Sequence, residues 1–204
     1  MFINYDIKFY FFTNTLDEII TKNIKNFKKL SFIYKSNSIN DINHTNINTI
    51  KSFCRKNRIP FFITDDFKLA KKYGTDGIFL SSSYKKIGNI ILKKKNFKII
   101  GSAHNQLEYS LKNKQSCEMI MLSPLFYNKK YSQNKILNVC KFNLLSMGWD
   151  KKICALGGIS LNNLKKLNMT KCSAVAFISL MKENNQKKAH LLFLVSGLFK
   201  YLLI

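Results

Sequence analysis

The sequence has few residues that would break it into parts. It holds eight glycines and two prolines in 204 residues, and no Gly/Ser-rich linker or shift in composition divides it. Hydrophobic residues make up 46% of the chain, which is enough to bury a core, so the chain need not be disordered. We therefore expect residues 1–204 to form one domain, a size at which a single hydrophobic core is usual.

Paired cysteines are also missing. The five cysteines are odd in number and never spaced as CxxC. Three of them lie in or beside apolar runs, where cysteine usually acts as a small buried side chain. Because the sequence also starts without a secretory signal, it predicts a reduced, cytoplasmic protein.

Long hydrophobic runs are scarce as well. The one candidate for a membrane span, residues 191–204, has fourteen residues and contains Lys200. An ordinary spanning helix needs about 20 consecutive apolar residues. The segment is better suited to a terminal helix packed on a core, so we expect no membrane partner.

Acidic residues are few, 11 against 34 Lys and Arg, and the formal net charge is +23 at pH 7. Such a charge can serve nucleic acid, an anionic membrane or acidic ligands. The basic residues are nearly all Lys, spread from Lys8 to Lys200 among Asn and Ile, a bias typical of AT-rich codons. Signatures of RNA-recognition modules and zinc knuckles are absent. We expect no dedicated nucleic-acid surface, and a basic nucleic-acid-binding or otherwise non-catalytic protein is the hypothesis from a different class.

Short apolar runs alternate with helix-like segments along the chain. The runs, apolar on both faces like parallel strands buried under helices, are residues 8–12, 30–34, 60–63, 77–80, 97–101, 119–122, 153–156 and 174–178. Segments with helical spacing and polar faces are residues 16–28, 42–56, 106–114 and 161–167. Eight strands, each followed by a candidate helix, predict the α/β class and a single (β/α)₈ TIM barrel. An open doubly wound sheet is the rival, but it would need a Gly-rich loop where the sequence has Thr13, Asn14 and Thr15.

In such a barrel the functional residues follow the carboxyl ends of the strands. Gly157 and Gly158 come directly after the seventh run, where a missing Cβ lets backbone amides approach a ligand, and Ser179 follows the eighth. The loops after strands seven and eight commonly bind phosphate through N–H groups and a helix dipole. We interpret this corner as a phosphate site, with a simple tight turn as the alternative. Asp76 precedes the fourth run at the opposite end, so we interpret it as a turn residue.

Several motifs together resemble one known family. They are IIGSAHN at residues 99–105, MIMLSPLF at 119–126, ALGGISLNN at 155–163 and AVAFIS at 174–179. In order and spacing they resemble the thiamine phosphate synthase family, which includes the TenI-type thiazole tautomerases. FFITDD at residues 61–66 and YGTDGIFL at 73–80 extend the resemblance, which runs from Lys8 to Met181. The combination is specific, although no single motif would suffice.

The resemblance implies a (β/α)₈ enzyme of thiamine biosynthesis. Such a synthase joins hydroxymethylpyrimidine diphosphate to a thiazole phosphate and releases pyrophosphate with the help of Mg²⁺. The diphosphate leaves, and the thiazole nitrogen attacks the carbocation-like species that forms. The protein then mainly positions substrates and stabilises charge. The implied partners are these two phosphorylated small molecules, and a homo-oligomer is left open.

The family's functional positions can be matched to this sequence one by one. Those of the thiazole-phosphate site match Gly157, Gly158, Ile178 and Ser179. Ser102 matches the serine of the glycine–serine element, and Lys35 lies where the family offers an Arg to the pyrophosphate. Asp65 fits the first magnesium carboxylate, although the residue before it, usually Asn, is Thr64 here.

The diphosphate side departs from the family pattern. The segment with the second magnesium carboxylate is replaced by serines and a tyrosine at residues 81–84. The pyrophosphate loop, usually rich in threonine, reads YNKKY at residues 127–131 and keeps only basic charge. Near Lys35, Ile33 stands for a usual Gln and Asn37 for a usual Lys. The candidate binding residues on this side are Thr64, Asn128, Lys129 and Lys130, and lysines that simply face water are the alternative.

His104 has two interpretations. TenI-type tautomerases use a histidine near this position for proton transfer, and imidazole titrates near neutral pH. Synthases also commonly carry this histidine, where it shapes the loop. We take Lys35, Ser102 and His104 as candidate catalytic residues of a synthase. A TenI-like tautomerase, or a barrel that binds thiazole phosphate without catalysis, is the alternative.

Overall fold

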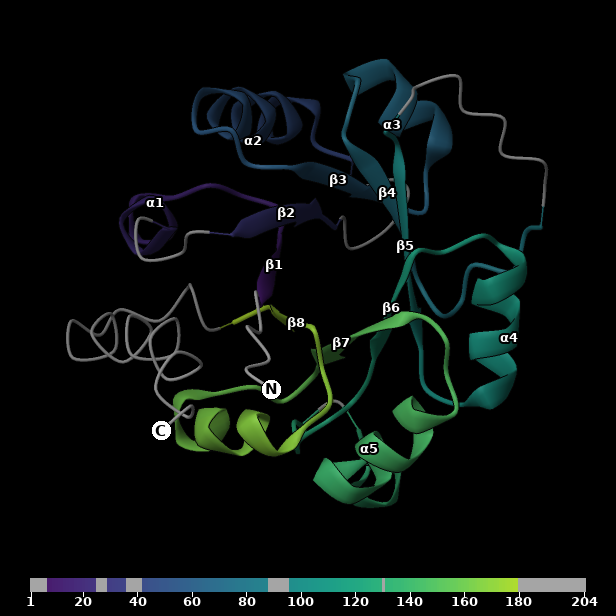
Figure 1. The fold of residues 1–204 in the computed structure, drawn as a ribbon. Helices are drawn as coiled ribbons and strands as arrows, with labels where there is room; N and C mark the ends of the chain where they lie inside the picture. The colour runs from purple at the N-terminus through teal and green to yellow at the C-terminus, as the bar shows by residue number, and fades with distance from the viewer. Residues whose placement is uncertain (1–6, 25–28, 36–41, 88–95, 130, 180–204) are drawn as a thin grey trace, which may run out of the picture.

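The computed structural model describes residues 7–24, 29–35, 42–87, 96–129 and 131–179. Within them eight parallel strands form a closed barrel in chain order, since β8 pairs with β1. The strands are β1 (Lys8–Thr13), β2 (Leu30–Tyr34), β3 (Phe61–Thr64), β4 (Gly77–Leu80), β5 (Lys98–Ala103), β6 (Met119–Leu122), β7 (Lys152–Leu156) and β8 (Ala174–Phe177). The helices are α1 (Glu18–Ile24), α2 (His44–Lys56), α3 (Phe67–Tyr73), α4 (Gln106–Lys114) and α5 (Asn138–Met147), with 3₁₀ helices η2 (Gln133–Lys135) and η3 (Leu161–Met169). Figure 1 shows the strands at the centre of the molecule and the helices around them.

The closed barrel confirms the predicted fold and excludes the open doubly wound sheet, because closure leaves the sheet without edges. The strand bounds differ most at the fifth run: the sequence predicts residues 97–101, whereas β5 covers Lys98–Ala103. Pairing with β6 continues as far as Ala103 and Leu122. Ser102 therefore lies inside a strand, not after it.

Two expected helices differ in the structure. Residues 161–167 lie in the 3₁₀ helix η3, not in an α-helix. The Asn163 side chain accepts the Ser160 N–H at 2.9 Å and donates to the Gly158 carbonyl at 2.7 Å, as part of a capping box at the start of η3. After β4, the described residues 81–87 contain no helix where one was expected.

Neighbouring residues of each strand point to opposite faces, so the barrel has an inner and an outer core. In β1, Tyr10 and Phe12 belong to the cluster inside the barrel, whereas Phe9 and Phe11 belong to the cluster under the helices. The rings of Phe12 and Phe79 meet edge to face inside the barrel, with centroids 5.0 Å apart. The interior is thus packed, and a ligand has to bind above it.

The helices α2 and α3 are bounded by capping interactions. The side chains of Asn43 and Asp66 each accept a backbone N–H from the first turn of their helix, at 2.9 and 2.8 Å. The helix α3 is followed by Gly74 in the left-handed region, at φ 57°. The helix α2 is followed by a left-handed residue as well, but this one is Arg58, at φ 55°.

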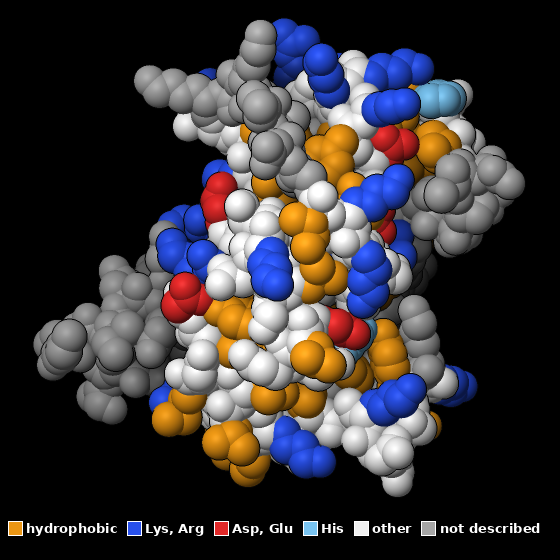
Figure 2. Space-filling model, turned by 90° about the vertical axis from the view of Figure 1, so that its right-hand side faces the viewer, with side chains coloured by type: hydrophobic (Ala, Val, Ile, Leu, Met, Phe, Trp, Pro, Cys, Tyr) orange, Lys and Arg blue, Asp and Glu red, His pale blue; other side chains and the backbone are white. Residues whose placement is uncertain are grey.

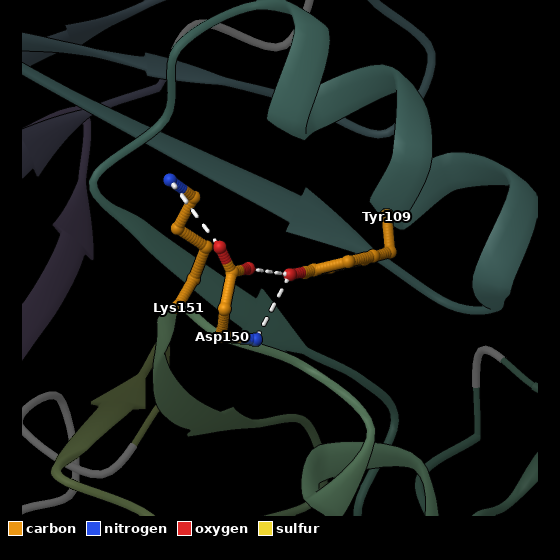
Figure 3. A network of polar contacts seen from close by, with 3 residues as sticks. All are labelled: Tyr109, Asp150 and Lys151. Carbon is orange, nitrogen blue, oxygen red and sulfur yellow. Dashed lines mark hydrogen bonds and ion pairs between the residues drawn. The ribbon is translucent and has the colours of Figure 1, made fainter.

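A polar network joins α4 to the segment before β7, as Figure 3 shows. The Tyr109 hydroxyl donates to Asp150 Oδ1 and accepts the Asp150 backbone N–H at 3.2 Å, while Lys151 Nζ lies 4.0 Å from Asp150 Oδ2. The hydrogen bond from Tyr109 lowers the pKa of Asp150. The Tyr109 ring also stacks on Trp149, with centroids 4.2 Å apart. These contacts anchor the helix that follows Ser102 and His104.

All five cysteines are free, as the sequence predicts. Cys54, Cys117, Cys154 and Cys172 are buried, and only Cys140, on α5, is exposed. Burial raises the pKa of Cys54 and of Cys117 to about 12. Burial raises the pKa of the Cys154 and Cys172 thiols as well.

Basic side chains are spread over the face of the molecule that Figure 2 shows. On the face in Figure 2, Lys and Arg side chains lie from top to bottom among hydrophobic and uncharged groups, with few acidic groups between them. This distribution agrees with the sequence, in which basic residues are spread from Lys8 to Lys200.

Some expectations concern residues outside the described part of the chain, namely Lys130, Met181 and residues 191–204. In the part that is described, no helix combines the length and the apolar character needed to cross a membrane.

Candidate functional site at the mouth of the barrel

A cavity of about 540 Å³ opens at the carboxyl ends of the strands. Its floor is the top of the barrel interior, formed by Phe12, Phe79, Leu156 and Ala176. Its walls include eight of the predicted site residues: Lys35, Ser102, His104, Asn128, Gly157, Gly158, Ile178 and Ser179. Barrels of this class bind their ligands at this end.

Two glycines after β7 shape one side of the cavity. Gly157 and Gly158 have φ of 94° and 69°, a region that L side chains rarely adopt. A Cβ on Gly158 would lie 2.2 Å from the carbonyl oxygen of Phe126, and one on Gly157 would lie 2.9 Å from Cα of Pro124. Both positions therefore require glycine for conformation and for space.

The segment after β6 holds this corner. The N–H of Leu125 donates to the carbonyl of Leu156 at 2.9 Å, and that of Phe126 to the carbonyl of Gly157 at 3.0 Å. Ser179 follows β8 at the same side of the cavity. Among the described residues, no acceptor takes the N–H groups of Gly158 and Ser179. The corner can therefore offer backbone donors to an anion.

The opposite side of the mouth is organised by side chains. Asp65, directly after β3, has φ 56°, and its Oδ1 accepts the backbone N–H of Ser81 at 2.7 Å. Thr64 ends β3, and its hydroxyl donates to the carbonyl of Tyr34 at 2.9 Å. Asp65 thus ties the end of β3 to the loop after β4, which lines the cavity through Ser81 and its neighbours.

A buried lysine supports the same loop from behind. Lys112, on α4, is fully buried, and its Nζ donates to the carbonyls of Ser81 and Tyr84 at 2.5 and 3.0 Å and to Gln115 Oε1 at 3.0 Å. Its stem packs against Gly101 of β5, where a Cβ would lie 2.9 Å from Lys112 Cδ. Removal of the ammonium from water lowers its pKa.

His104 connects three loops at the cavity wall. Its Nδ1 lies 2.6 Å from the carbonyl oxygen of Ser123, and its Nε2 lies 3.2 Å from the hydroxyl of Ser82. A carbonyl oxygen only accepts, so Nδ1 donates to Ser123, while Nε2 pairs with the Ser82 hydroxyl. The Glu108 carboxylate accepts the His104 backbone N–H at 2.8 Å. The ring is thereby held between the loops after β4 and β6.

Three of the predicted site residues lie apart from the cavity wall. Thr64, Asp65 and Lys129 are described but do not line the cavity, and Lys130 lies outside the described residues. For Thr64 and Asp65 the reason is the bonds that turn their side chains to neighbouring loops.

Sequence reasoning missed Ser160 as a wall residue and Lys112 as a support, and it named Tyr127 and Tyr131 only as part of the loop at residues 127–131. The signal for Lys112 was its place three residues after the buried Tyr109, on the same stripe of α4.

Comparison with known proteins gives a consistent match. A family model described as thiamine monophosphate synthase matches residues 18–181. The thiamine-phosphate synthase of Flavobacterium johnsoniae is 32% identical over 147 residues, which cover 68% of this chain and 69% of that protein. That of Mannheimia succiniciproducens is 29% identical over 130 residues, 62% of this chain and 59% of that protein. The matches therefore span about three fifths of the length of such relatives as the Mannheimia and Actinobacillus proteins, 59% and 63%.

Solved structures share the fold at low identity. The thiamine phosphate pyrophosphorylase of Pyrococcus furiosus superposes with a TM-score of 0.75 at 15% identity and covers 98% of this chain and 99% of its own. The 3-hexulose-6-phosphate synthase of Salmonella typhimurium gives a TM-score of 0.68 at 13% identity, with 95% and 100% covered. At such identities the likeness concerns the barrel alone.

Proposed function

The chain belongs to the thiamine monophosphate synthase family, and from this membership we propose that it is a cytoplasmic thiamine phosphate synthase. It couples hydroxymethylpyrimidine diphosphate to thiazole phosphate. The bond between the pyrimidine methylene carbon and the diphosphate oxygen breaks, and a bond from that carbon to the thiazole nitrogen forms. Pyrophosphate leaves with the electron pair, so no proton has to move in this step.

The observation that carries the proposal is the corner after β7 and β8. Gly157 and Gly158 hold left-handed conformations that no other residue fits, and they face the same cavity as Ile178 and Ser179. Backbone N–H groups at this corner suit the phosphate of the thiazole substrate. They would fix the thiazole ring over the floor of the cavity, with its nitrogen toward the reacting carbon.

The fit of Mg²⁺ depends on one carboxylate. Oδ1 of Asp65 already accepts the Ser81 N–H, and among the described residues no three His, Cys, Asp or Glu gather as a metal site. Mg²⁺ is often held by one or two carboxylates together with substrate phosphates and water. An ion held by Asp65 and the diphosphate would have to bind at the edge of the cavity, because Asp65 follows β3 beside the lining residue Ser81 and does not itself line the wall. Bound there, Mg²⁺ would neutralise charge on the leaving pyrophosphate.

Cationic and polar side chains complete the diphosphate side of the proposal. Lys35 and Asn128 line the cavity, and Lys129 lies in the same loop as Asn128. Their role is to grip the pyrophosphate oxygens, in place of the threonine donors of the family pattern. Ser102, buried at the end of β5, lines the wall between the two substrates.

His104 supports a second candidate, a TenI-like thiazole tautomerase. Its imidazole lines the cavity, where a base could remove a proton from a bound thiazole. The two candidates share the thiazole-phosphate corner and differ in their need for the pyrimidine diphosphate.

The test is a coupling assay with purified protein, hydroxymethylpyrimidine diphosphate, thiazole phosphate and Mg²⁺, in which thiamine phosphate is measured by fluorescence after oxidation. We expect product from the wild-type chain and none from Ser179→Asp, which places a carboxylate at the phosphate corner. Binding of thiazole phosphate without product would reject the synthase. Isomerisation of the thiazole, lost in His104→Gln, would then establish the tautomerase.

A further inference from the structure

A second cavity lies at the opposite end of the barrel. It has a volume of about 310 Å³ and lies where α2 leads into β3 and α3 into β4. Its apolar wall is formed by Ile59, Pro60, Phe61 and Tyr73. Its charged groups are Lys51, Arg55, Arg58 and Asp76.

Both arginines of the chain line this cavity. The sequence holds 34 Lys and Arg, and Arg55 and Arg58 are its only arginines. A guanidinium presents its N–H groups as a planar fork that matches two oxygens of a phosphate or carboxylate, whereas lysine binds as a point charge. All the remaining Lys and Arg positions of the chain are lysines. Arginine, the side chain that binds two oxygens of an anion at once, therefore occurs at this one place.

Arg58 occupies a position that favours glycine. The N–H of Ile59 donates to the carbonyl of Cys54 at 2.8 Å and that of Arg58 to Arg55 at 3.3 Å, which is the Schellman pattern at the end of α2. In this pattern the left-handed residue is usually glycine, yet Arg58 has φ 55°. Ser116 takes the same left-handed position after α4, so this conformation places Arg58 at the cavity but does not by itself point to a ligand.

Capping of the helix ends does not explain the arginines. The carbonyls at the end of α2 accept backbone N–H groups and the side-chain amide of Asn57, and Ala70 at the end of α3 accepts from Thr75. Among the described residues no ion pair joins Arg55 or Arg58 to a carboxylate. Asp76, the acid in the cavity wall, accepts the backbone N–H of Phe61 at 2.9 Å. Both guanidinium groups thus line the cavity, Arg55 from α2 and Arg58 from the turn after it, and these neighbouring groups accept none of their N–H donors.

We propose that this cavity binds the phosphate group of a small organic molecule. Arg55 and Arg58 hold the phosphate oxygens with Lys51 beside them, and the organic part packs on Pro60 and Tyr73. The volume, about 310 Å³, suits a small molecule. The site lies at the other end of the strands from the mouth, so the proposal is independent of the coupling reaction.

The arginine count makes a direct test possible. In a ¹⁵N-labelled full-length chain, the arginine Nε–Hε region of the NMR spectrum contains two signals, and single substitutions assign them. Titration with inorganic phosphate, at ionic strength held constant with chloride, should shift both signals saturably. Phenyl phosphate should do so at lower concentration, because its ring can bury apolar surface.

Matched variants separate the site from general charge. Arg58→Gly should weaken phenyl phosphate binding about tenfold or more through the lost fork, and should raise the midpoint of thermal unfolding because glycine relieves the left-handed backbone. Arg55→Lys keeps the charge and should also weaken binding. Lys56→Met, in the same turn but outside the cavity lining, should leave the affinity for phenyl phosphate unchanged, as measured from both arginine signals.

Three outcomes would overturn the proposal. The arginine signals do not shift when phosphate is added, chloride alone shifts them as much as phosphate does, or a short RNA shifts them and phenyl phosphate does not. Coupling activity at the mouth is measured separately and does not enter this result.

Discussion

The mouth of the barrel is built from backbone on its β7–β8 side and from side chains on its β3–β5 side. On the first side, left-handed glycines and the strand-like bonds of Leu125 and Phe126 fix the shape. On the second, Asp65 holds the N–H of Ser81 and Lys112 holds its carbonyl. Ser81, on the second side, is thus hydrogen-bonded through its N–H to Asp65 and through its carbonyl to Lys112.

This difference explains which side keeps the family pattern. A Cβ at Gly158 would lie 2.2 Å from a carbonyl oxygen, so no other residue can replace that glycine without moving the backbone. Side-chain contacts, in contrast, can be exchanged for other side chains that reach the same backbone groups. The loop after β4 has serines where the resemblance led us to expect an acidic segment, and it is held by a lysine from α4.

The largest effect is expected from Gly158→Ala. The left-handed backbone and the clash with Phe126 together should lower the free energy of unfolding by about 2–5 kcal/mol. Affinity for thiazole phosphate should fall about tenfold or more, as calorimetric titration would measure.

Gly74→Ala is the matched control, since Gly74 has φ 57° but a Cβ added there would meet no atom within 4 Å. It should cost only about 1–2 kcal/mol and leave thiazole-phosphate affinity unchanged. Equal losses of affinity in both variants would contradict the role of the corner.

Lys112→Met should act on the other side. The carbonyl of Ser81 loses its buried donor, which should lower stability by about 1–3 kcal/mol. In a coupling assay the KM for the pyrimidine diphosphate should rise, while thiazole-phosphate affinity stays constant. Lys114→Met, exposed on the same helix, is the control.

The same variant predicts a pH dependence. Burial lowers the pKa of Lys112 below its ordinary 10.5, so between the lowered value and 10.5 the unfolded chain binds more protons than the folded one. The contribution of Lys112 to the unfolding free energy therefore rises with pH in this window. The unfolding free energies of wild type and Lys112→Met should be measured by denaturation at several alkaline pH values. The value for wild type should rise relative to that for the variant as the pH increases. A difference that does not depend on pH would reject the lowered pKa of Lys112.

Asp65→Asn separates charge from structure at the end of β3. Asparagine tolerates the left-handed backbone and can still accept the Ser81 N–H, so the stability should change little. The lost charge should raise the Mg²⁺ concentration needed for half-maximal coupling, by about tenfold on the usual scale of a charged interaction. Unchanged magnesium dependence would remove Asp65 from the proposed metal site.

The smallest effect is expected from Lys35→Met. Lys35 is exposed at the cavity wall, where solvent screens its charge. The KM for the pyrimidine diphosphate should rise severalfold and more at low salt than at high salt. If the affinity for thiazole phosphate changes instead, Lys35 belongs to the thiazole-phosphate side of the mouth and the prediction is wrong.

The barrel and the glycine corner could be predicted because both follow from local rules. The strands are apolar on both faces, and a pair of glycines after a strand predicts backbone conformations that other residues rarely adopt. Lys112 was not predicted, because a lysine on a helix normally faces water, and its place on the stripe of Tyr109 does not show that the carbonyls of Ser81 and Tyr84 receive its ammonium group. The bond from Asp65 to Ser81 likewise arises from the register of β3 on β4, which no short motif encodes.

The distribution of the thiols offers a practical route to these measurements. Four of the five cysteines are buried with raised pKa values, so their reactive thiolate forms are suppressed. Cys140 is exposed in the first turn of α5. The residue before that helix, Leu137, donates its N–H to the carbonyl of Pro124 at 3.0 Å, beside the glycine corner. A maleimide dye on the unmodified folded chain would therefore attach at a single place and report on the mouth from just outside it.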